Sequence, residues 1–274
     1  MTTDYVFRTG SDNGRIQVDT LAAMLDPTTT RALAECGAVS GRRCLELGAG
    51  GGSISRWLAN RVGPNGTVDA VDVDTSHLVE APGLTVHTMD LNDGLPDGGP
   101  YDLIHARMLM MHLRRRREVF DALVAKLAPG GWLVLCDATG LPPTAVAARH
   151  DADRDLFDRV LEAGTTRVGP AVGMDLQWAH AAGDHMHRAG LTNVREEEFR
   201  FTSPGGSDGM LYYRSLVQQL EPLLTTFGFT EEELWRLENV LLDPVFAAWS
   251  YQFVITVGRR PPTPCTESSR ARDR

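Results

Sequence analysis

Long apolar runs, a positive net charge and paired cysteines are all missing from this 274-residue sequence. No uninterrupted apolar stretch is long enough to span a bilayer, and residues 1–14 are polar and lack the apolar core of a signal peptide. The formal net charge is -9, which argues against unassisted binding to nucleic acid or to an anionic membrane surface. We therefore expect a cytoplasmic protein that binds neither nucleic acid nor membranes.

The four cysteines are far apart in the sequence and form no CxxC pair. Cys44 and Cys136 lie inside apolar runs that are typical of strands, where a thiol packs as a small hydrophobic group. Together with the missing export signal, this pattern predicts that Cys36, Cys44, Cys136 and Cys265 are all reduced.

Short apolar runs alternate with segments of helical periodicity through the first half of the chain. Asp26, Pro27 and Gly37 fit the start and stop of a first helix. Strands are expected at residues 42–47, 67–74, 84–90, 101–106 and 132–136, with helices after the first and fourth of them. This alternation predicts an α/β fold with a doubly wound parallel sheet.

The second half of the chain follows a different pattern. Residues 141–190 and 207–242 are predicted to be helical, with a helix start at the capping box of Thr230 and Glu233. Strands are expected at 194–201 and 251–258. The resulting division is an N-terminal helical segment or lid (1–40), a cofactor-binding core (41–140), helical cap inserts with the last two strands (141–258), and a disordered tail (259–274).

A glycine-rich turn follows the first expected strand, in the sequence ELGAGGGS from Glu46 to Ser53. Ser53 takes the place of the third glycine in the dinucleotide fingerprint G-x-G-x-x-G. The carboxylate of Glu46 would repel a pyrophosphate but can accept hydrogen bonds from an ammonium group. S-adenosylmethionine (SAM) carries an ammonium and a sulfonium and no phosphate, so the turn favours SAM.

Two further carboxylates support this interpretation. Asp72 ends the second strand at about the distance from the glycine turn at which an acidic residue reaches ribose hydroxyls, and Val73 follows it. Asp90, after the third strand, is placed to receive an adenine amino group.

Residues 42–139 resemble the core of a class I SAM-dependent methyltransferase, similar to ubiquinone and menaquinone C-methylases and to natural-product methyltransferases. The resemblance is carried by LELGAGGG, VDAVDVD, TMDLNDGLP, YDLIHARMLMMHL and LAPGGWLVLCD. It implies a seven-stranded sheet of order 3-2-1-4-5-7-6 with strand 7 antiparallel, and helical inserts that cap the substrate. The chain departs from the commoner pattern by having Glu46 in place of aspartate and Ala49 in place of cysteine.

The same resemblance implies where the cofactor lies. Glu46 and Gly48 would contact the methionine moiety, Asp72 the ribose, Asp90 and the Leu91 backbone the adenine, and the Ala106 carbonyl would lie near the SAM ammonium. The full cofactor-binding set is Glu46, Gly48, Gly50, Gly52, Asp72, Val73, Asp90, Leu91, Ala106 and Arg107.

Methyl transfer from a sulfonium needs chiefly the alignment of nucleophile and methyl group and the exclusion of water. A hydroxyl acceptor also benefits from a general base, for which His112, in the loop after the fourth strand, is the candidate. His105 lies within that strand and is expected to be a packed core residue. The candidate substrate contacts are Tyr5, Met108, Met111 and Tyr212.

Two charged clusters are given no role in binding. His180, His185 and His187 with Asp184 have the wrong spacing for one helical face, so no metal is expected. The arginines at 114–117 are expected to form a solvated helix face.

The sequence therefore predicts a SAM-dependent methyltransferase that acts on a small molecule. The chain is rich in arginine and alanine and Lys126 is its only lysine, which is typical of a GC-rich bacterial genome and suggests secondary metabolism. One alternative is a SAM-binding protein that catalyses a non-methylating reaction, such as a cyclase or isomerase. Another, disfavoured by Glu46 and Ser53, is an NAD-dependent oxidoreductase. A homodimer is left open.

Overall fold

The computed structural model describes residue 7 and residues 10–263 of the chain. Tyr5, Cys265 and most of the predicted tail lie outside the described residues. Among the described residues, no helix is both long and apolar enough to cross a membrane.

A seven-stranded sheet forms the core, in the order β3-β2-β1-β4-β5-β10-β7. β10 runs antiparallel to both β5 and β7, and the other neighbours pair in parallel. The predicted order 3-2-1-4-5-7-6 with an antiparallel strand 7 is therefore confirmed. The strands are β1 (Arg43–Leu47), β2 (Thr67–Asp72), β3 (Leu84–Thr88), β4 (Tyr101–Arg107), β5 (Leu127–Ala138), β7 (Thr192–Phe199) and β10 (Phe253–Arg259).

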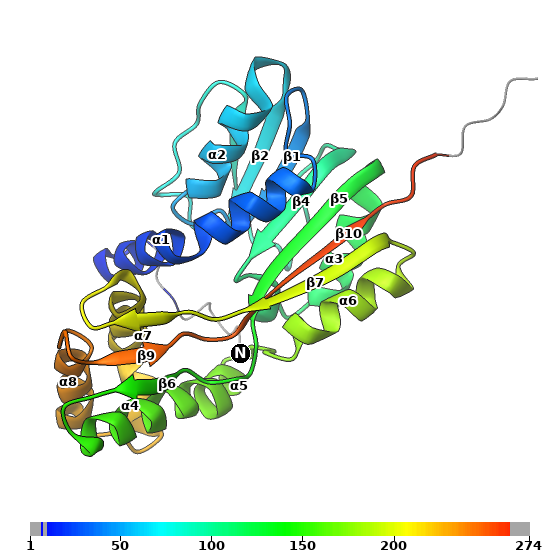
Figure 1. Ribbon diagram of the computed structural model, residues 1–274. Helices are drawn as coiled ribbons and strands as arrows, with labels where there is room; N and C mark the ends of the chain where they lie inside the picture. The colour runs from blue at the N-terminus through cyan, green and yellow to red at the C-terminus, as the bar shows by residue number, and fades with distance from the viewer. Residues whose placement is uncertain (1–6, 8–9, 264–274) are drawn as a thin grey trace, which may run out of the picture.

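Helices cover both faces of this sheet and extend beyond one end of it (Figure 1). The α-helices are α1 (Asp12–Glu35), α2 (Ser53–Val62), α3 (Arg116–Lys126), α4 (Asp151–Ala163), α5 (Gly169–Ala171), α6 (Trp178–Arg188), α7 (Asp208–Thr226) and α8 (Glu231–Val240). Two 3₁₀ turns, η1 (Gly63–Asn65) and η2 (Met110–His112), and one π turn, η3 (Gly164–Val168), complete the helical elements. The capping box predicted at Thr230 is confirmed, since its hydroxyl accepts the Glu233 N–H and the Glu233 carboxylate accepts the Thr230 N–H.

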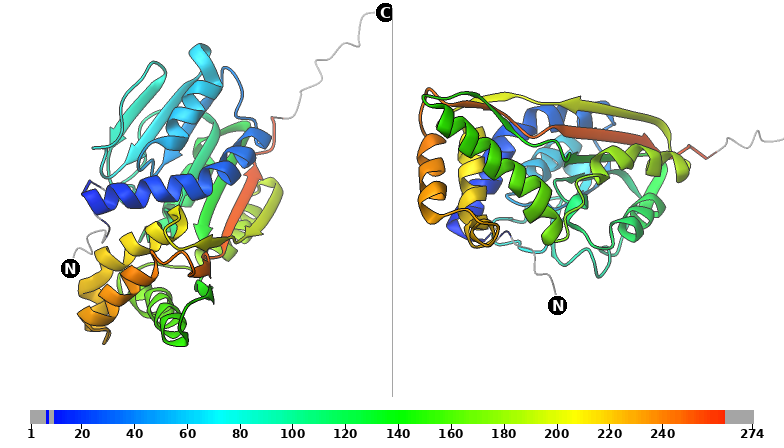
Figure 2. Two further views of the ribbon diagram at one scale, coloured as in Figure 1. Left: turned by 60° about the vertical axis from the view of Figure 1, so that its left-hand side comes forward. Right: turned by 90° about the horizontal axis from the view of Figure 1, so that it is seen from below.

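Three apolar clusters hold the elements together. One packs α1 and α2 on one face of the sheet, and a second packs α3 and α6 on the other face. The third lies in the cap, where Phe157, Tyr213 and Phe246 bring α4, α7 and the chain before β9 into contact. Figure 2 shows the cap helices α4, α7 and α8, drawn in green, gold and orange, gathered at one end of the molecule.

The expected start of the first helix was wrong. α1 begins at Asp12, with the Ser11 hydroxyl accepting the Gly14 N–H at 3.0 Å, and runs through Pro27 without ending. Asp26 is therefore in the middle of the helix and does not cap it. Pro27 cannot donate the backbone hydrogen bond that a helix interior normally has. Packing of α1 against α7 and α2 offsets this loss, so the helix continues.

The prediction that the segment 141–190 is helical throughout was wrong. Its residues Thr144–Ala147 form β6, an edge strand of a three-stranded antiparallel sheet of order β6-β9-β8, with β8 (Thr202–Pro204) and β9 (Ala247–Trp249). β6 pairs with a strand about a hundred residues further along the chain, with Ala145 opposite Ala248. Strands this short have no periodicity of their own to reveal them.

Candidate functional site

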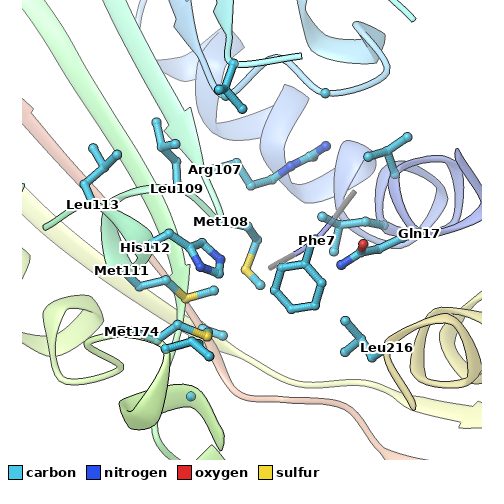
Figure 3. A pocket seen from close by; sticks show the side chains of 18 of the residues that line it. Phe7, Gln17, Arg107, Met108, Leu109, Met111, His112, Leu113, Met174 and Leu216 are labelled. Atoms are coloured by element: carbon cyan, nitrogen blue, oxygen red, sulfur yellow. The ribbon is translucent and has the colours of Figure 1, made fainter. Parts of the chain in front are cut away.

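One cavity of about 250 Å³ opens where the carboxyl ends of five core strands meet the cap. Crevices at this edge of a doubly wound sheet are where such folds bind their ligands. Its walls come from the glycine turn after β1, the ends of β2, β3, β4 and β5, helix α1, and the cap (Figure 3). The lining includes eight of the predicted site residues, namely Gly48, Gly50, Asp72, Val73, Asp90, Leu91, Arg107 and His112, together with the predicted substrate contacts Met108, Met111 and Tyr212.

The glycine turn needs glycine for its backbone shape. Gly48 and Gly50 have φ angles of 66° and 53°, in the left-handed region that other residues rarely adopt. A side chain at Gly48 would also meet Leu109, since its Cβ would lie 3.3 Å from that side chain. The turn therefore keeps its backbone open towards the cavity, and α2 begins directly after it at Ser53.

Asp72 joins the turn to the second strand. Its carboxylate accepts the Gly50 N–H at 2.8 Å and the Asp74 N–H at 3.0 Å, and the residue is 8% exposed. Burial raises the pKa of Asp72 above its ordinary value, although the backbone donors oppose this shift. The carboxylate oxygens thus lie at the cavity wall with lone pairs left to accept further hydrogen bonds.

Asp90 takes part in a turn of its own. Its carboxylate accepts the backbone N–H of Asn92 at 2.8 Å, and Leu91 is buried beside it. Asp72 and Asp90 therefore line the same cavity from neighbouring strands, as the sequence predicted, and their roles towards ribose and adenine stay predictions.

Glu46, Gly52 and Ala106 do not line the cavity. The Glu46 carboxylate lies 2.7 Å from Nδ1 of His105, and both side chains are buried in the sheet. His105 is thus a hydrogen-bonded core residue, as expected. The contacts of Glu46 and Ala106 with the methionine end of the cofactor stay predictions, and for Glu46 the structure shows a different partner.

Arg107 connects the cavity to α1. Its guanidinium donates to the Asp26 carboxylate at 2.9 Å and to the Thr29 hydroxyl at 3.0 Å. The Ser53 hydroxyl donates to the same Asp26 oxygen at 3.1 Å. Asp26 therefore ties α1 to the end of β4 and to the start of α2. Sequence reasoning missed this because it placed Asp26 at a helix start.

His112 ends the 3₁₀ turn η2 and faces the cavity. Its ring packs edge-on against Phe7, with the centroids 5.9 Å apart. Burial lowers the pKa of His112 to about 4, and the nearby Arg116 charge acts in the same direction. The imidazole is therefore neutral at physiological pH and is a weak proton acceptor.

Met108 adopts an uncommon backbone conformation at the end of β4. Its φ is 51°, a left-handed value that costs a non-glycine residue of order 1–3 kcal/mol and that clusters at functional sites. The conformation is held by the Met108 N–H donating to the Cys136 carbonyl at 2.7 Å and the Leu109 N–H donating to the Asp137 carboxylate at 3.0 Å. Asp137 thus fixes the loop that carries Met108, Met111 and His112.

Asp137 itself was missed in the sequence because it continues the apolar run of β5. It is 2% exposed, and burial raises its pKa to about 7, although the backbone donors of Met111 and Leu109 oppose the shift. Nothing local distinguishes this residue from an exposed aspartate at a strand end.

Replacing Asp137 with asparagine should change how stability depends on pH. Because the folded-state pKa lies above the ordinary 3.8, the folded state keeps a proton that the unfolded state has lost, so this contribution to stability disappears as pH rises through about 7. The free energy of unfolding should fall between about pH 6.5 and pH 8 in the wild type and fall less in Asp137→Asn. His112, with its lowered pKa, changes stability only below about pH 6.5 and in the opposite direction.

Urea unfolding at several pH values measures this difference. Asp93→Asn, at an exposed position outside the cavity, is the matched control and should keep the wild-type slope. Equal slopes in the wild type and in Asp137→Asn would contradict the assignment.

Two histidines of α6 contact an aromatic ring and a carboxylate. His185 stacks on Trp178 with centroids 4.9 Å apart, and His180 lies 3.3 Å from Glu198. Within the described part of the chain, no group of three histidine, cysteine or acidic side chains is arranged to hold a metal ion.

This sheet order and this cavity together define a class I SAM-dependent methyltransferase fold. A family of methyltransferase domains matches residues 19–196, which is more than half of the chain. The chain therefore belongs to the methyltransferase domain family, whose members use SAM, and the predicted family and cofactor are confirmed.

Curated proteins of similar sequence include methyltransferases. The chain is 28% identical over 134 residues to a trans-aconitate 2-methyltransferase from Mycobacterium tuberculosis, a match that covers 48% of this chain and 51% of that protein. It is 28% identical over 98 residues to methyltransferase str2 of Strobilurus tenacellus, covering 35% of each chain. The chain thus spans about half the length, or less, of these curated relatives.

Solved structures share the fold over nearly the whole chain. A phosphoethanolamine N-methyltransferase 2 from Haemonchus contortus superposes with a TM-score of 0.57 and 14% identity, covering 94% of this chain and 60% of that one. A cyclopropane-fatty-acyl-phospholipid synthase-like protein from Lactobacillus casei superposes with a TM-score of 0.54 and 16% identity, covering 94% and 98%. At such low identity these likenesses establish the fold alone.

Proposed function

We propose that this protein transfers the methyl group of SAM to a small-molecule acceptor. The observation that carries the proposal is the cavity, where the glycine turn, Asp72 and Asp90 lie at one end and a separate set of apolar side chains from the cap lies at the other. A cofactor and a second small molecule can thus share one cavity. The trans-aconitate 2-methyltransferases among the relatives also act on a small molecule, as their name states.

The residues at the strand ends fit SAM. Asp72 presents carboxylate oxygens that ribose hydroxyls can reach, and Asp90 and Leu91 would receive the adenine. Gly48 and Gly50 line the cavity without side chains, so the methionine end would lie against their backbone. When bound there, SAM supplies a methyl group on a sulfonium that is already activated for in-line displacement.

The other residues orient the acceptor and exclude water. Methionine and aromatic side chains line the same cavity as the glycine turn, so they would hold the acceptor against the methyl group and shield it from water. His112 lies in this wall and, being neutral, would accept a proton from a hydroxyl acceptor. Tyr212, Met108 and Met111 would contact the acceptor's body.

The amino-acid composition bears on the biological setting. The arginine- and alanine-rich composition, with a single lysine, supports an origin in a GC-rich bacterial genome and a role in secondary metabolism. We infer a small acceptor rather than a macromolecule, because cap residues such as Tyr212 and Leu216 line a cavity of about 250 Å³.

Equilibrium binding tests the cofactor. Isothermal titration of the purified chain with SAM, S-adenosylhomocysteine and NADH should show binding of the first two and not of NADH. Incubation with methyl-labelled SAM and candidate acceptors should then transfer the label. Product that requires SAM without consuming it would favour a non-methylating reaction, and NADH binding without SAM binding would refute the proposal.

A further inference from the structure

The acceptor end of the cavity has an apolar wall. Six side chains from four separate segments line this part of the cavity, and we call them the acceptor chamber. Figure 3 labels all of them except Tyr212. Tyr212 and Leu216 are four residues apart on α7, so they lie on one face of that helix. The chamber consists of Phe7, Met108, Met111, Met174, Tyr212 and Leu216.

The chamber contains no uncompensated charge among the described residues. Among residue 7 and residues 10–263, four charged residues line the cavity, and Asp72 and Asp90 are the two predicted to contact the cofactor. Arg114 is exposed to solvent, and its backbone N–H donates to the Asn92 side chain, which in turn donates to Asp90. Within the described part of the chain, Arg107 and Arg116 are the cations near the chamber and His112. Each is paired with a carboxylate, Arg107 with Asp26 at 2.9 Å and Arg116 with Asp175 at 3.3 Å.

The polar groups that remain are neutral. His112 packs against Phe7 at the edge of the chamber, and its lowered pKa keeps the imidazole uncharged. Methionine side chains are flexible and polarizable and make favourable contacts with aromatic rings. The chamber thus suits a ring-bearing apolar body with one polar group directed at His112.

We propose that the acceptor is an uncharged, ring-bearing hydroxy compound of the phenol type, with its hydroxyl next to His112. This inference rests on the proposed methyl transfer and adds the class of acceptor. It separates this chain from relatives that methylate trans-aconitate, which is a tricarboxylate. Moving several carboxylates into a chamber without free cations would leave charges desolvated and unpaired, which is strongly unfavourable.

The transfer step conserves charge within the site. The hydroxyl oxygen forms a bond to the methyl carbon, and the carbon–sulfur bond breaks with its electron pair left on sulfur. The hydroxyl proton passes to a ring nitrogen of His112, so one positive charge moves from sulfonium to imidazolium. A phenol suits a weak base better than an aliphatic alcohol does, because a phenolic hydroxyl has a pKa of only about 10.

Binding of two matched probes tests the class of acceptor. 2-Naphthol and 2-naphthoate share one ring system, and only the second is charged at neutral pH. With the full chain saturated by S-adenosylhomocysteine, 2-naphthol should bind at least about tenfold more tightly than 2-naphthoate or trans-aconitate, a factor typical of one unfavourable desolvated interaction. A 2-naphthol that does not bind, or binds no more tightly than 2-naphthoate, overturns the proposal.

The Asp26→Asn variant tests the electrostatic reason. It keeps a hydrogen-bond acceptor for Arg107 and removes the matching charge, so 2-naphthoate should bind about tenfold more tightly than to the wild type. The affinity for 2-naphthol should change little. Asp12→Asn makes the same charge change at an exposed position in α1 and should affect neither probe. Unchanged 2-naphthoate affinity in Asp26→Asn contradicts the role of the Arg107–Asp26 pair.

Binding of the cofactor separates failure of the methyl-transfer proposal from failure of the proposed acceptor class. If S-adenosylhomocysteine and SAM do not bind, the methyl-transfer proposal fails before any acceptor is tested. If they bind and 2-naphthol shows no preference over 2-naphthoate, only the class of acceptor is wrong.

Discussion

Replacing His112 with alanine should lower the turnover rate on a hydroxyl acceptor by about 100-fold, while the affinity for SAM barely changes. General-base catalysis contributes about 10²–10⁴-fold, and a base whose pKa is far below the working pH gives the lower end of that range. The affinity should be spared because His112 packs against Phe7 and is not one of the predicted SAM contacts. Steady-state kinetics at saturating acceptor, together with titration of SAM, measure both quantities.

The pH profile gives an independent check on His112. Since burial lowers its pKa to about 4, the imidazole remains neutral well below pH 6.5 and protonates only as pH falls towards 4. The value of kcat/KM should therefore show no inflection near pH 6.5, the ordinary histidine pKa. His180→Ala, a change at a half-exposed histidine outside the cavity, should keep the wild-type rate. If His112→Ala keeps nearly full turnover, His112 is not a general base, and alignment of the acceptor with the methyl group would explain the catalysis.

Replacing Asp72 with alanine should weaken SAM binding by about 10- to 150-fold. Hydrogen bonds to a charged acceptor contribute about 1.5–3 kcal/mol, which corresponds to that range of affinity. The loss has two sources in the structure, because Asp72 would receive the ribose hydroxyls and also holds the Gly50 N–H of the glycine turn at 2.8 Å. Isothermal titration of the folded variant measures the dissociation constant.

Two further variants refine the test of Asp72. Asp72→Asn keeps an oxygen for the Gly50 N–H and loses the charge, so its affinity should lie between wild type and Asp72→Ala. Asp93→Ala, at an exposed position outside the cavity, should bind SAM as the wild type does. A folded Asp72→Ala protein with an unchanged dissociation constant would reject Asp72 as the ribose ligand.

Much of the core could be predicted because its signals are local. Each buried strand is a short apolar run, and the glycine turn and the carboxylates that follow the strands stand next to those runs in the sequence. The order of strands in the sheet then came from the resemblance to a known fold. For the same reason Asp72, Asp90 and His112 could be placed before their surroundings were known.

Several features of the site could not be predicted, because they depend on contacts between segments that are distant in the sequence. Asp26 meets Arg107 across 81 positions of the chain, and its place next to Pro27 made it resemble a helix cap. Phe7 and Met174 reach the cavity from segments with no motif of their own. The burial that shifts the pKa values of His112 and Asp137 likewise exists only in the folded protein.

The antiparallel pairing of β10 has a consequence for how this protein can be changed. Phe199 at the end of β7 pairs with Phe253 at the start of β10, so residues 200–252 leave the sheet and return to it at adjacent positions. This excursion carries Tyr212, Leu216 and Tyr251 into the cavity, whereas the glycine turn and Asp72 are fixed elsewhere. Because its ends are already held together, a segment of different length costs little extra closure entropy. We therefore expect that a segment of another length can replace this excursion and alter the choice of acceptor, provided that its contacts with α1, α4 and β6 are kept.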